Sequence, residues 1–318
     1  MQSDQLAARL KAWTLRYPSV IVVVLLLVTF SLMSPHFATR TNLEATLAAN
    51  SVILIGAVGM TVVFIGGGID LSVSTVISAG AVVSGIVMAE TQSVALGVAA
   101  AIGVGAGFGL LNGVLIGIFG LTPFITTMGT QLIARGLAFI LSGGIAVKDT
   151  PDAMFDLGFA VFLGIPVIAW IAVAILVVVA TAVGLTTWGR DVVLCGASRR
   201  AARYAGIETR KIDLSIYLLS GVLAGLAGVV SIANLGNAIP GVGDTLLLIT
   251  IGAVVLGGTS MNGGEGSVSR TLIGVALLAT LTSGLNLLGI PFYDQLVVQG
   301  VLIFLGAALG GRLAGYRA

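Results

Sequence analysis

The sequence holds few side chains that could carry covalent or metal chemistry. Among 318 residues there is one histidine, His36, and one cysteine, Cys195. These two cannot supply a metal-ligand cluster, an internal disulfide or the usual nucleophile and base of an enzyme. We therefore expect a chain that is not an enzyme and binds no metal or cofactor itself.

Charged side chains are also scarce, so a charge within an apolar stretch is a candidate for function. Residues 66–75, GGGIDLSVST, place Asp70 and three hydroxyl groups between two apolar runs. This stretch cannot face lipid, because its carboxylate and backbone would lack partners. Asp70 either caps the next helix through backbone amides, or it belongs to a gate or contacts a substrate.

Arg135 is the one basic residue that falls well inside an apolar run. If its helix starts near Pro123, Arg135 lies about 18 Å along the helix axis, beyond the membrane centre toward the outside. Intramembrane charges are costly and usually face a polar interior. Arg135 could be structural, paired with a carbonyl or an outer acid, or it could meet a ligand.

Amide and aromatic side chains are further candidates for a polar path, since such groups commonly hold sugars. Each amide alone is also typical of hydrogen bonding between helices. The residues that we expect along a path are Asp70, Asn112, Phe124, Arg135, Asn234 and Asn286. Other candidates of the same kinds are Asn50, Phe64, Gln131, Asn237, Phe292 and Gln299.

The elements that must position these residues are membrane helices. The chain is 57% hydrophobic and 9% charged, with mean hydropathy +1.13, whereas soluble domains are about 25% charged. We expect one all-α polytopic domain over residues 1–318, with about ten spans. They fall near 19–34, 47–66, 72–89, 93–119, 123–141, 164–187, 213–234, 246–261, 269–288 and 293–311. The glycine-rich fourth span and the short eighth span could be bent or broken helices.

The distribution of Lys and Arg predicts that both termini are cytoplasmic, because basic residues near span ends are held inside. With that orientation the inside set is Arg9, Lys11, Arg16, Arg190, Arg199, Arg200, Arg203, Arg210, Lys211, Arg270, Arg312 and Arg317. The outside set is Arg40 and Lys148, and most acids, Asp244 among them, fall outside. A net charge of +2 without a basic block beside aromatic residues argues against a nucleic-acid partner.

Two segments outside the spans have distinct expected roles. Residues 1–18 place Leu6, Leu10 and Trp13 at helical spacing among basic residues, which predicts a helix on the inner membrane surface. A cleaved secretory signal is the competing interpretation. Residues 143–163 form the largest outer loop and are acidic.

Residues 188–213 interrupt the apolar pattern with six basic residues on the inside. Their centre predicts a short helix that presents Arg199, Arg200 and Arg203 beside the small Ala201 and Ala202. Gly196 and Gly206 bracket this helix, which favours a docking element. The alternative is an ordinary basic loop attracted to anionic lipid headgroups.

A second glycine-rich turn, residues 257–269, echoes the first. Both contain Ser-Val-Ser, at 72–74 and at 267–269, which suggests an internal repeat. The second turn lacks the Lys-Ser/Thr ending of a phosphate-binding loop, so we expect no nucleotide there.

Several short strings, in their order and spacing, are specific for one family. They are GGIDLSV at 67–73, TPFI at 122–125 followed by Arg135-Gly136, GR at 189–190, AARxxGI at 201–207, VVLGGTS at 254–260 and GLNLLG at 284–289. With them the chain resembles, from about residue 45 to 310, the membrane permease subunit of bacterial ABC importers of the ribose, xylose and galactose type.

The resemblance implies an inner-membrane subunit that pairs with itself or with a similar permease. Cytoplasmic ATPase subunits, which would hold ATP and Mg²⁺, would dock on residues 189–207, and an extracytoplasmic binding protein would deliver the sugar. The residues that match the coupling motif of the family are Gly189, Arg190, Gly196, Ala201, Ala202, Arg203 and Gly206.

One departure from the family pattern bears on substrate and assembly. Many relatives carry an acid pair, written ELDAIA, where this chain has residues 247–252, LLITIG. The substrate could be unusual, or a partner permease could keep the acids. A branched-chain amino-acid permease is the near alternative. An ion-coupled secondary transporter is less favoured, because we find no carboxylate in the middle of a span.

Overall fold

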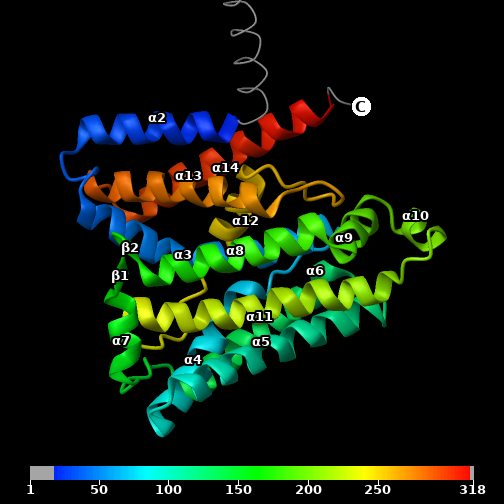
Figure 1. Ribbon diagram of the computed structural model, residues 1–318, viewed down its shortest axis with the longest axis horizontal. Coiled ribbons are helices and arrows are strands. Elements are labelled where there is room, and N and C mark those ends of the chain that lie inside the picture. Colours follow the sequence, from blue (N-terminus) through cyan, green and yellow to red (C-terminus); the bar gives the residue numbers. More distant parts are fainter. Residues whose placement is uncertain (1–17, 316–318) are drawn as a thin grey trace, which may run out of the picture.

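The computed structural model describes residues 18–315, with side chains through residue 306, and this part of the chain is mostly helical (Figure 1). The helices are α2 (Pro18–Met33), α3 (Arg40–Ile65), α4 (Val73–Thr91), α5 (Val94–Gly117), α6 (Pro123–Ser142), α7 (Asp152–Phe159), α8 (Val167–Leu185), α9 (Thr187–Ala197), α10 (Arg199–Tyr204), α11 (Thr209–Leu235), α12 (Leu246–Leu256), α13 (Val268–Leu287) and α14 (Phe292–Gly315). The predicted surface helix at residues 1–18 lies outside the described residues, except that Pro18 begins α2.

Each of the ten predicted apolar segments contains a helix, which confirms the all-α membrane fold. Within the described residues 18–315, seven helices are long and apolar enough to cross a membrane, namely α3, α4, α5, α6, α8, α11 and α13. Three shorter apolar helices, Ser19–Met33, Leu246–Leu256 and Phe292–Gly306, account for the other segments. Ten full crossings and two cytoplasmic termini remain predictions.

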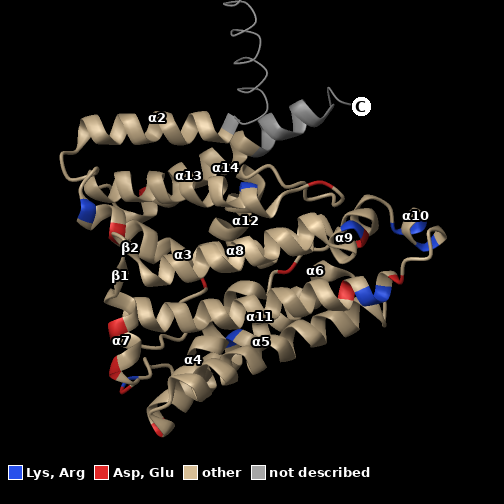
Figure 2. Ribbon diagram, viewed as in Figure 1, with Lys and Arg blue, Asp and Glu red and all other residues tan. Residues whose placement is uncertain are grey.

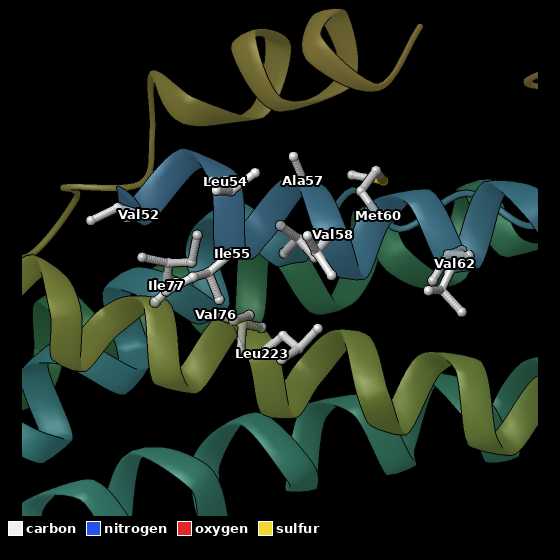
Figure 3. Packing of buried hydrophobic residues seen from close by; sticks show 14 of the residues in the cluster. Val52, Leu54, Ile55, Ala57, Val58, Met60, Val62, Val76, Ile77 and Leu223 are labelled. Atoms are coloured by element: carbon white, nitrogen blue, oxygen red, sulfur yellow. The ribbon is translucent and has the colours of Figure 1, made fainter. Parts of the chain in front are cut away.

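Helix α3 forms the centre of the bundle. It is buried on all sides from Leu54 to Ile65, as expected of a helix that is apolar around its whole circumference. In Figure 1 it lies between a group containing α2 and α13 and a group containing α4, α5 and α11. Figure 3 shows α3 side chains such as Ile55 and Val58 above Val76 of α4 and Leu223 of α11. The central core therefore consists of α3, α4 and α11.

Helix α5 is continuous, so the prediction that its glycines could break it is wrong. The glycines spaced four residues apart form a packing surface against α11. A Cβ atom at Gly105 would lie 2.1 Å from the carbonyl oxygen of Gly221, and one at Gly109 would lie 2.4 Å from that of Tyr217. Small residues let membrane helices approach closely, and here they bring the two backbones into contact.

Helix α12 is short, as predicted, and each of the two glycine-rich turns leads into a helix. The first turn joins α3 to α4 and the second joins α12 to α13. In both, the first serine of Ser-Val-Ser is the N-cap residue, Ser72 for α4 and Ser267 for α13. The repeated tripeptide thus marks the same structural position twice.

The predicted outer loop carries two small elements that the apolar pattern did not indicate. Helix α7 is followed by the strands β1 (Val161–Phe162) and β2 (Ile165–Pro166), which pair antiparallel across Leu163 and Gly164. Both turn residues have positive φ, as two-residue hairpins favour. The loop is therefore partly folded.

Charges divide between the two ends of the bundle (Figure 2). Basic residues of α9, α10 and the start of α11 gather at one end, while α7 and its surroundings at the opposite end are mainly acidic. This division agrees with the predicted orientation, in which the basic end is cytoplasmic.

Candidate functional site

Asp70 lies in a buried turn and accepts hydrogen bonds on both carboxylate oxygens. Oδ1 accepts from the backbone N–H of Ser72 at 3.0 Å and from its hydroxyl at 2.6 Å, and Oδ2 accepts from the Ser220 hydroxyl at 2.8 Å. Ser220 follows Thr209, the first residue of α11, by 11 positions, so Asp70 lies about 16 Å from the basic end of that helix. The turn is inside the protein, and the Asp70 carboxylate binds Ser72, the N-cap residue of α4.

Asn112 extends this arrangement to two further helices. Its side-chain amide donates to the Ser72 hydroxyl at 2.9 Å, and its carbonyl oxygen accepts from the Thr130 hydroxyl at 2.8 Å. We call Asp70, Ser72, Asn112, Thr130 and Ser220 the Asp70 cluster. All five side chains are buried, and together they join the start of α4 to α5, α6 and α11. Two of the predicted path residues, Asp70 and Asn112, therefore belong to the same cluster. Both are buried and closed to a substrate in this conformation.

Tyr217 and the backbone also fix the turn that carries Asp70. The Tyr217 hydroxyl donates to the carbonyl oxygen of Ile69 at 3.1 Å, and the Tyr217 side chain is fully buried. Buried polar groups cost free energy unless they are hydrogen-bonded. These hydrogen bonds therefore hold the turn in one geometry.

Arg135 forms an ion pair with an acid, as the structural interpretation of this residue predicts. Its guanidinium lies 2.8 Å from the carboxylate of Asp244, and its Cζ lies 6.0 Å from the ring centre of Phe139. The Arg135 side chain is 54% exposed and that of Asp244 is 28% exposed. The pair is therefore structural in this conformation and also accessible.

Asp244 reaches Arg135 because the segment between α11 and α12 folds against the bundle. Ala238 and Val147 exchange backbone hydrogen bonds of 2.8 and 3.1 Å. Further along, the N–H of Gly243 donates to the Ser78 hydroxyl of α4 at 2.8 Å. These contacts place Asp244 against α6.

The other predicted path residues lie apart from the Asp70 cluster. Phe124 is exposed at the start of α6. Asn234 is half-buried in the last turn of α11, 14 residues beyond Ser220 and so about 21 Å from it. Asn286 is exposed and accepts a hydrogen bond of 2.7 Å from Gln295, which joins α13 to α14. The six predicted residues therefore do not form one site within a single chain.

The predicted docking segment folds as α9 and α10, and the expected short helix at its centre is confirmed. Arg199 does not point outward as expected, since its guanidinium binds the buried carboxylate of Asp213 at 2.5 and 2.7 Å. The hydrogen bonds to Asp213 raise the pKa of Arg199 above its ordinary value, so the Arg199 guanidinium stays charged at physiological pH. Ala202 is also buried. Arg199 and Ala202 therefore fix α10 against the rest of the chain.

The opposite face of α10 is open. Arg200, Ala201 and Arg203 are exposed, and the Arg200 guanidinium lies over the Tyr204 ring at 5.8 Å. Gly206 ends the helix with φ +81°, a conformation that favours glycine.

The remaining two residues of the predicted coupling set lie at the start of α9. Arg190 is exposed. A Cβ atom at Gly189 would lie 2.0 Å from the carbonyl oxygen of Val183 in α8, so the tight joint between α8 and α9 requires glycine there.

Three residues of these sites were missing from the sequence predictions. Ser220 and Thr130 complete the Asp70 cluster, and Asp213 holds Arg199. Asp213 ends the basic segment 188–213, but that segment also contains Asp191 and Glu208, so nothing in the sequence set Asp213 apart. Nothing in their local sequence singled out Ser220 or Thr130.

Residues 42–306 match the family described as "Branched-chain amino acid transport system / permease component". The chain belongs to this permease family. Its relatives include the ribose import permease protein RbsC of Escherichia coli K12, 37% identical over 95% of each chain. The L-arabinose transport system permease protein AraH of the same strain is 35% identical over 93% of this chain and 90% of its own. The D-allose transport system permease protein AlsC, also from that strain, is 31% identical over 92% and 91%.

These similarities confirm the family that the sequence motifs indicated. No solved structure matches this permease significantly. This chain belongs to the permease family and has seven long apolar helices among its described residues, so it is a multi-pass protein of the bacterial inner membrane. It is a transporter component that is not itself catalytic.

Proposed function

We propose that this permease is the membrane subunit of an ATP-driven, binding-protein-dependent importer that forms the path for a monosaccharide or similar small polyol. The observation that carries the proposal is the 37% identity to a ribose import permease along 95% of the chain. Relatives named for L-arabinose and D-allose transport extend the similarity to other monosaccharides.

A cytoplasmic ATPase subunit docks on α10 in this proposal. The exposed Arg200, Ala201 and Arg203 offer positive charge around a small residue that lets a partner approach closely. Arg199 and its partner Asp213 fix this surface in place from the opposite face of the helix. ATP and Mg²⁺ bind to the ATPase, and its closure moves α10 to alternate access between the two sides.

A sugar-binding protein approaches the acidic end of the bundle. Lys148, Asp149, Asp152 and Asp156 are exposed on and beside α7. A partner that presents basic side chains would match this charge.

A second permease covers the exposed face of α6. Arg135 lies 12 residues after Pro123, the first residue of α6, and so about 18 Å along the helix. An ion pair at that depth is costly against lipid, so this face lies against a partner permease or the water-filled path between the two. The partner is a second copy or a homologous chain.

A branched-chain amino-acid substrate is the second candidate, because the matched family carries that description. The ribose, arabinose and allose permeases argue for the sugar. Uptake by the purified importer, with labelled pentoses, hexoses and branched-chain amino acids offered in parallel, separates the two candidates.

Purification of the tagged chain from its native membrane in mild detergent tests the assembly. We expect an ABC ATPase subunit to purify with it. A second permease beside this chain would establish a heterodimer and supply the acid pair that the chain lacks. Recovery of a lone chain that transports solute under an ion gradient without ATP would contradict the proposal.

A further inference from the structure

Three backbone segments come into close contact at the basic end of the bundle. Near the end of α9, a Cβ atom at Gly196 would lie 1.8 Å from the carbonyl oxygen of Ile65 and 2.6 Å from the nitrogen of Gly264. The N–H of Gly264 donates a hydrogen bond of 2.9 Å to that same carbonyl. We call residues 65–67, 196–197 and 263–264 the glycine joint.

The joint requires glycine for two independent reasons. Gly67, Gly263 and Gly264 have φ of +77°, +85° and +75°, which other residues rarely adopt. A Cβ atom at Gly263 would also lie 2.7 Å from Gly67 Cα, and one at Gly264 would lie 2.6 Å from Ala197 Cα. These neighbours are backbone atoms and cannot rotate away. Any larger residue must move a whole segment.

The joint connects the two sites described above. On one side, Ala197 is followed by the N-cap Ser198 and then by α10, the proposed ATPase dock. On the other side, Gly67 is three residues from Asp70, whose carboxylate binds Ser220 directly. This contact therefore links the dock to the Asp70 cluster through the end of α9 and the first glycine-rich turn, beside the link that Arg199, Asp213 and α11 provide.

The joint is suited to transmit displacement. A layer of flexible side chains can absorb a shift by changing rotamers, whereas close-packed protein has low compressibility and passes the shift on. The second glycine-rich turn also touches the first here, through the hydrogen bond between Gly264 and Ile65. A movement of α9 and α10 must therefore displace both turns together.

We propose that Gly196, Gly263 and Gly264 are positioning residues that couple the movement of α10 to the Asp70 cluster and so to the transport path. The inference rests on the proposed function, because it assigns to closure of the ATP-bound ATPase the movement that the joint transmits.

The test uses the complete importer, with its ATPase and binding protein, in proteoliposomes. Gly196→Ala and Gly264→Ala are compared with Gly184→Ala, a helical glycine of α8 with no neighbour within 4 Å of its Cβ position. We expect the joint variants to hydrolyse ATP but to move about 2- to 30-fold less sugar per ATP, the range found when a coupling network is disturbed. Gly184→Ala keeps the wild-type ratio.

A measurement on the unaltered importer covers the case in which a joint variant does not assemble. Hydrogen exchange is compared with and without a non-hydrolysable ATP analogue. We expect protection to change together in residues 195–206, 64–72 and 260–267. A change confined to residues 195–206, or a wild-type sugar-to-ATP ratio in assembled Gly196→Ala and Gly264→Ala, would overturn the role of the joint. Absence of ATP-driven uptake by the wild type would instead refute the proposed function.

Discussion

At the residue scale, the polar side chains of the Asp70 cluster bind one another. Asp70 accepts three hydrogen bonds, and Asn112 uses both its amide and its carbonyl. In a medium of low polarity each of these bonds is strong, and an unmade one is costly. The Asp70 cluster therefore stabilises one arrangement of α4, α5, α6 and α11.

Removal of the Asn112 amide tests this cluster. In Asn112→Ala the Ser72 hydroxyl loses a donor and Thr130 loses an acceptor, so we expect a loss of about 1–3 kcal/mol in stability, seen as a lower Tm in detergent. The control is Asn234→Ala, a half-buried amide near the end of α11, which should change Tm little. Equal Tm shifts in the two variants would show that the cluster has no special stabilising role.

The Arg135–Asp244 pair allows a charge-swap test. Arg135→Gln leaves Asp244 without its partner and should lower the yield of folded protein, because an unpaired charge within the membrane is costly. In Arg135→Asp/Asp244→Arg the attraction is restored, and the yield should recover. Transport by the recovered protein then decides between the two interpretations of Arg135. Wild-type uptake would mean a purely structural pair, and lost uptake would mean that the guanidinium is needed where it stands.

The site was only partly predictable from the sequence, for reasons seen in single residues. Asp70 was identified because an acid within an apolar stretch is conspicuous. Its contact with Ser220 joins residues 150 positions apart, and nothing local indicates that. Arg199 and Ala202 are three residues apart and so share one face of α10, but only the fold shows that α11 covers that face.

At the element scale, α5 and α11 are held together by backbone contact. A pair of substitutions in α5 tests this. A Cβ atom at Gly105 would lie 2.1 Å from the Gly221 oxygen, whereas one at Gly107 has no neighbour within 4 Å. We expect Gly105→Ala to lower Tm strongly, while Gly107→Ala is neutral or stabilising by up to about 1 kcal/mol through helix propensity. The same effect of both on Tm would contradict the close approach of α5 and α11.

The open face of α10 leads to a separate prediction about docking. Arg203→Glu reverses the charge of a side chain that has no structural partner in our account, so membrane insertion and Tm should stay unchanged. Binding of the ATPase should weaken or become uncoupled from the substrate, measured by co-purification and by substrate-stimulated ATP hydrolysis. Arg210→Glu, at an exposed basic residue at the start of α11 and outside residues 189–207, is the control. Unchanged substrate-stimulated hydrolysis in Arg203→Glu would refute docking on α10.

The helices themselves were largely predictable, because polar and glycine-rich stretches interrupt apolar runs of the right length. The boundaries were less so. Helix α3 begins at Arg40, seven residues before the predicted span, because Thr39 accepts a hydrogen bond from the N–H of Asn42 and the polar residues that follow continue the helix. Helix α7 and the hairpin β1–β2 were missed, since apolar patterning does not report short elements in an acidic loop.

At the scale of the whole molecule, the charge distribution and the exposed apolar surface describe a protein across a membrane. Basic residues cluster at the end that carries α10 and acidic residues at the end that carries α7 (Figure 2). Between these ends, large side chains such as Leu32, Val178 and Phe304 are exposed, as a lipid-facing surface requires. The two ends are thus fitted for different partners.

ATP-driven sugar uptake by the reconstituted importer tests the central claim most directly. The chain, its co-purified ATPase and binding protein are placed in proteoliposomes without any ion gradient, and labelled monosaccharides are supplied on the side of the binding protein. We predict uptake that requires ATP and the binding protein and that stops when the ATPase is omitted. Uptake that proceeds without ATP and depends on an H⁺ or Na⁺ gradient would contradict the account.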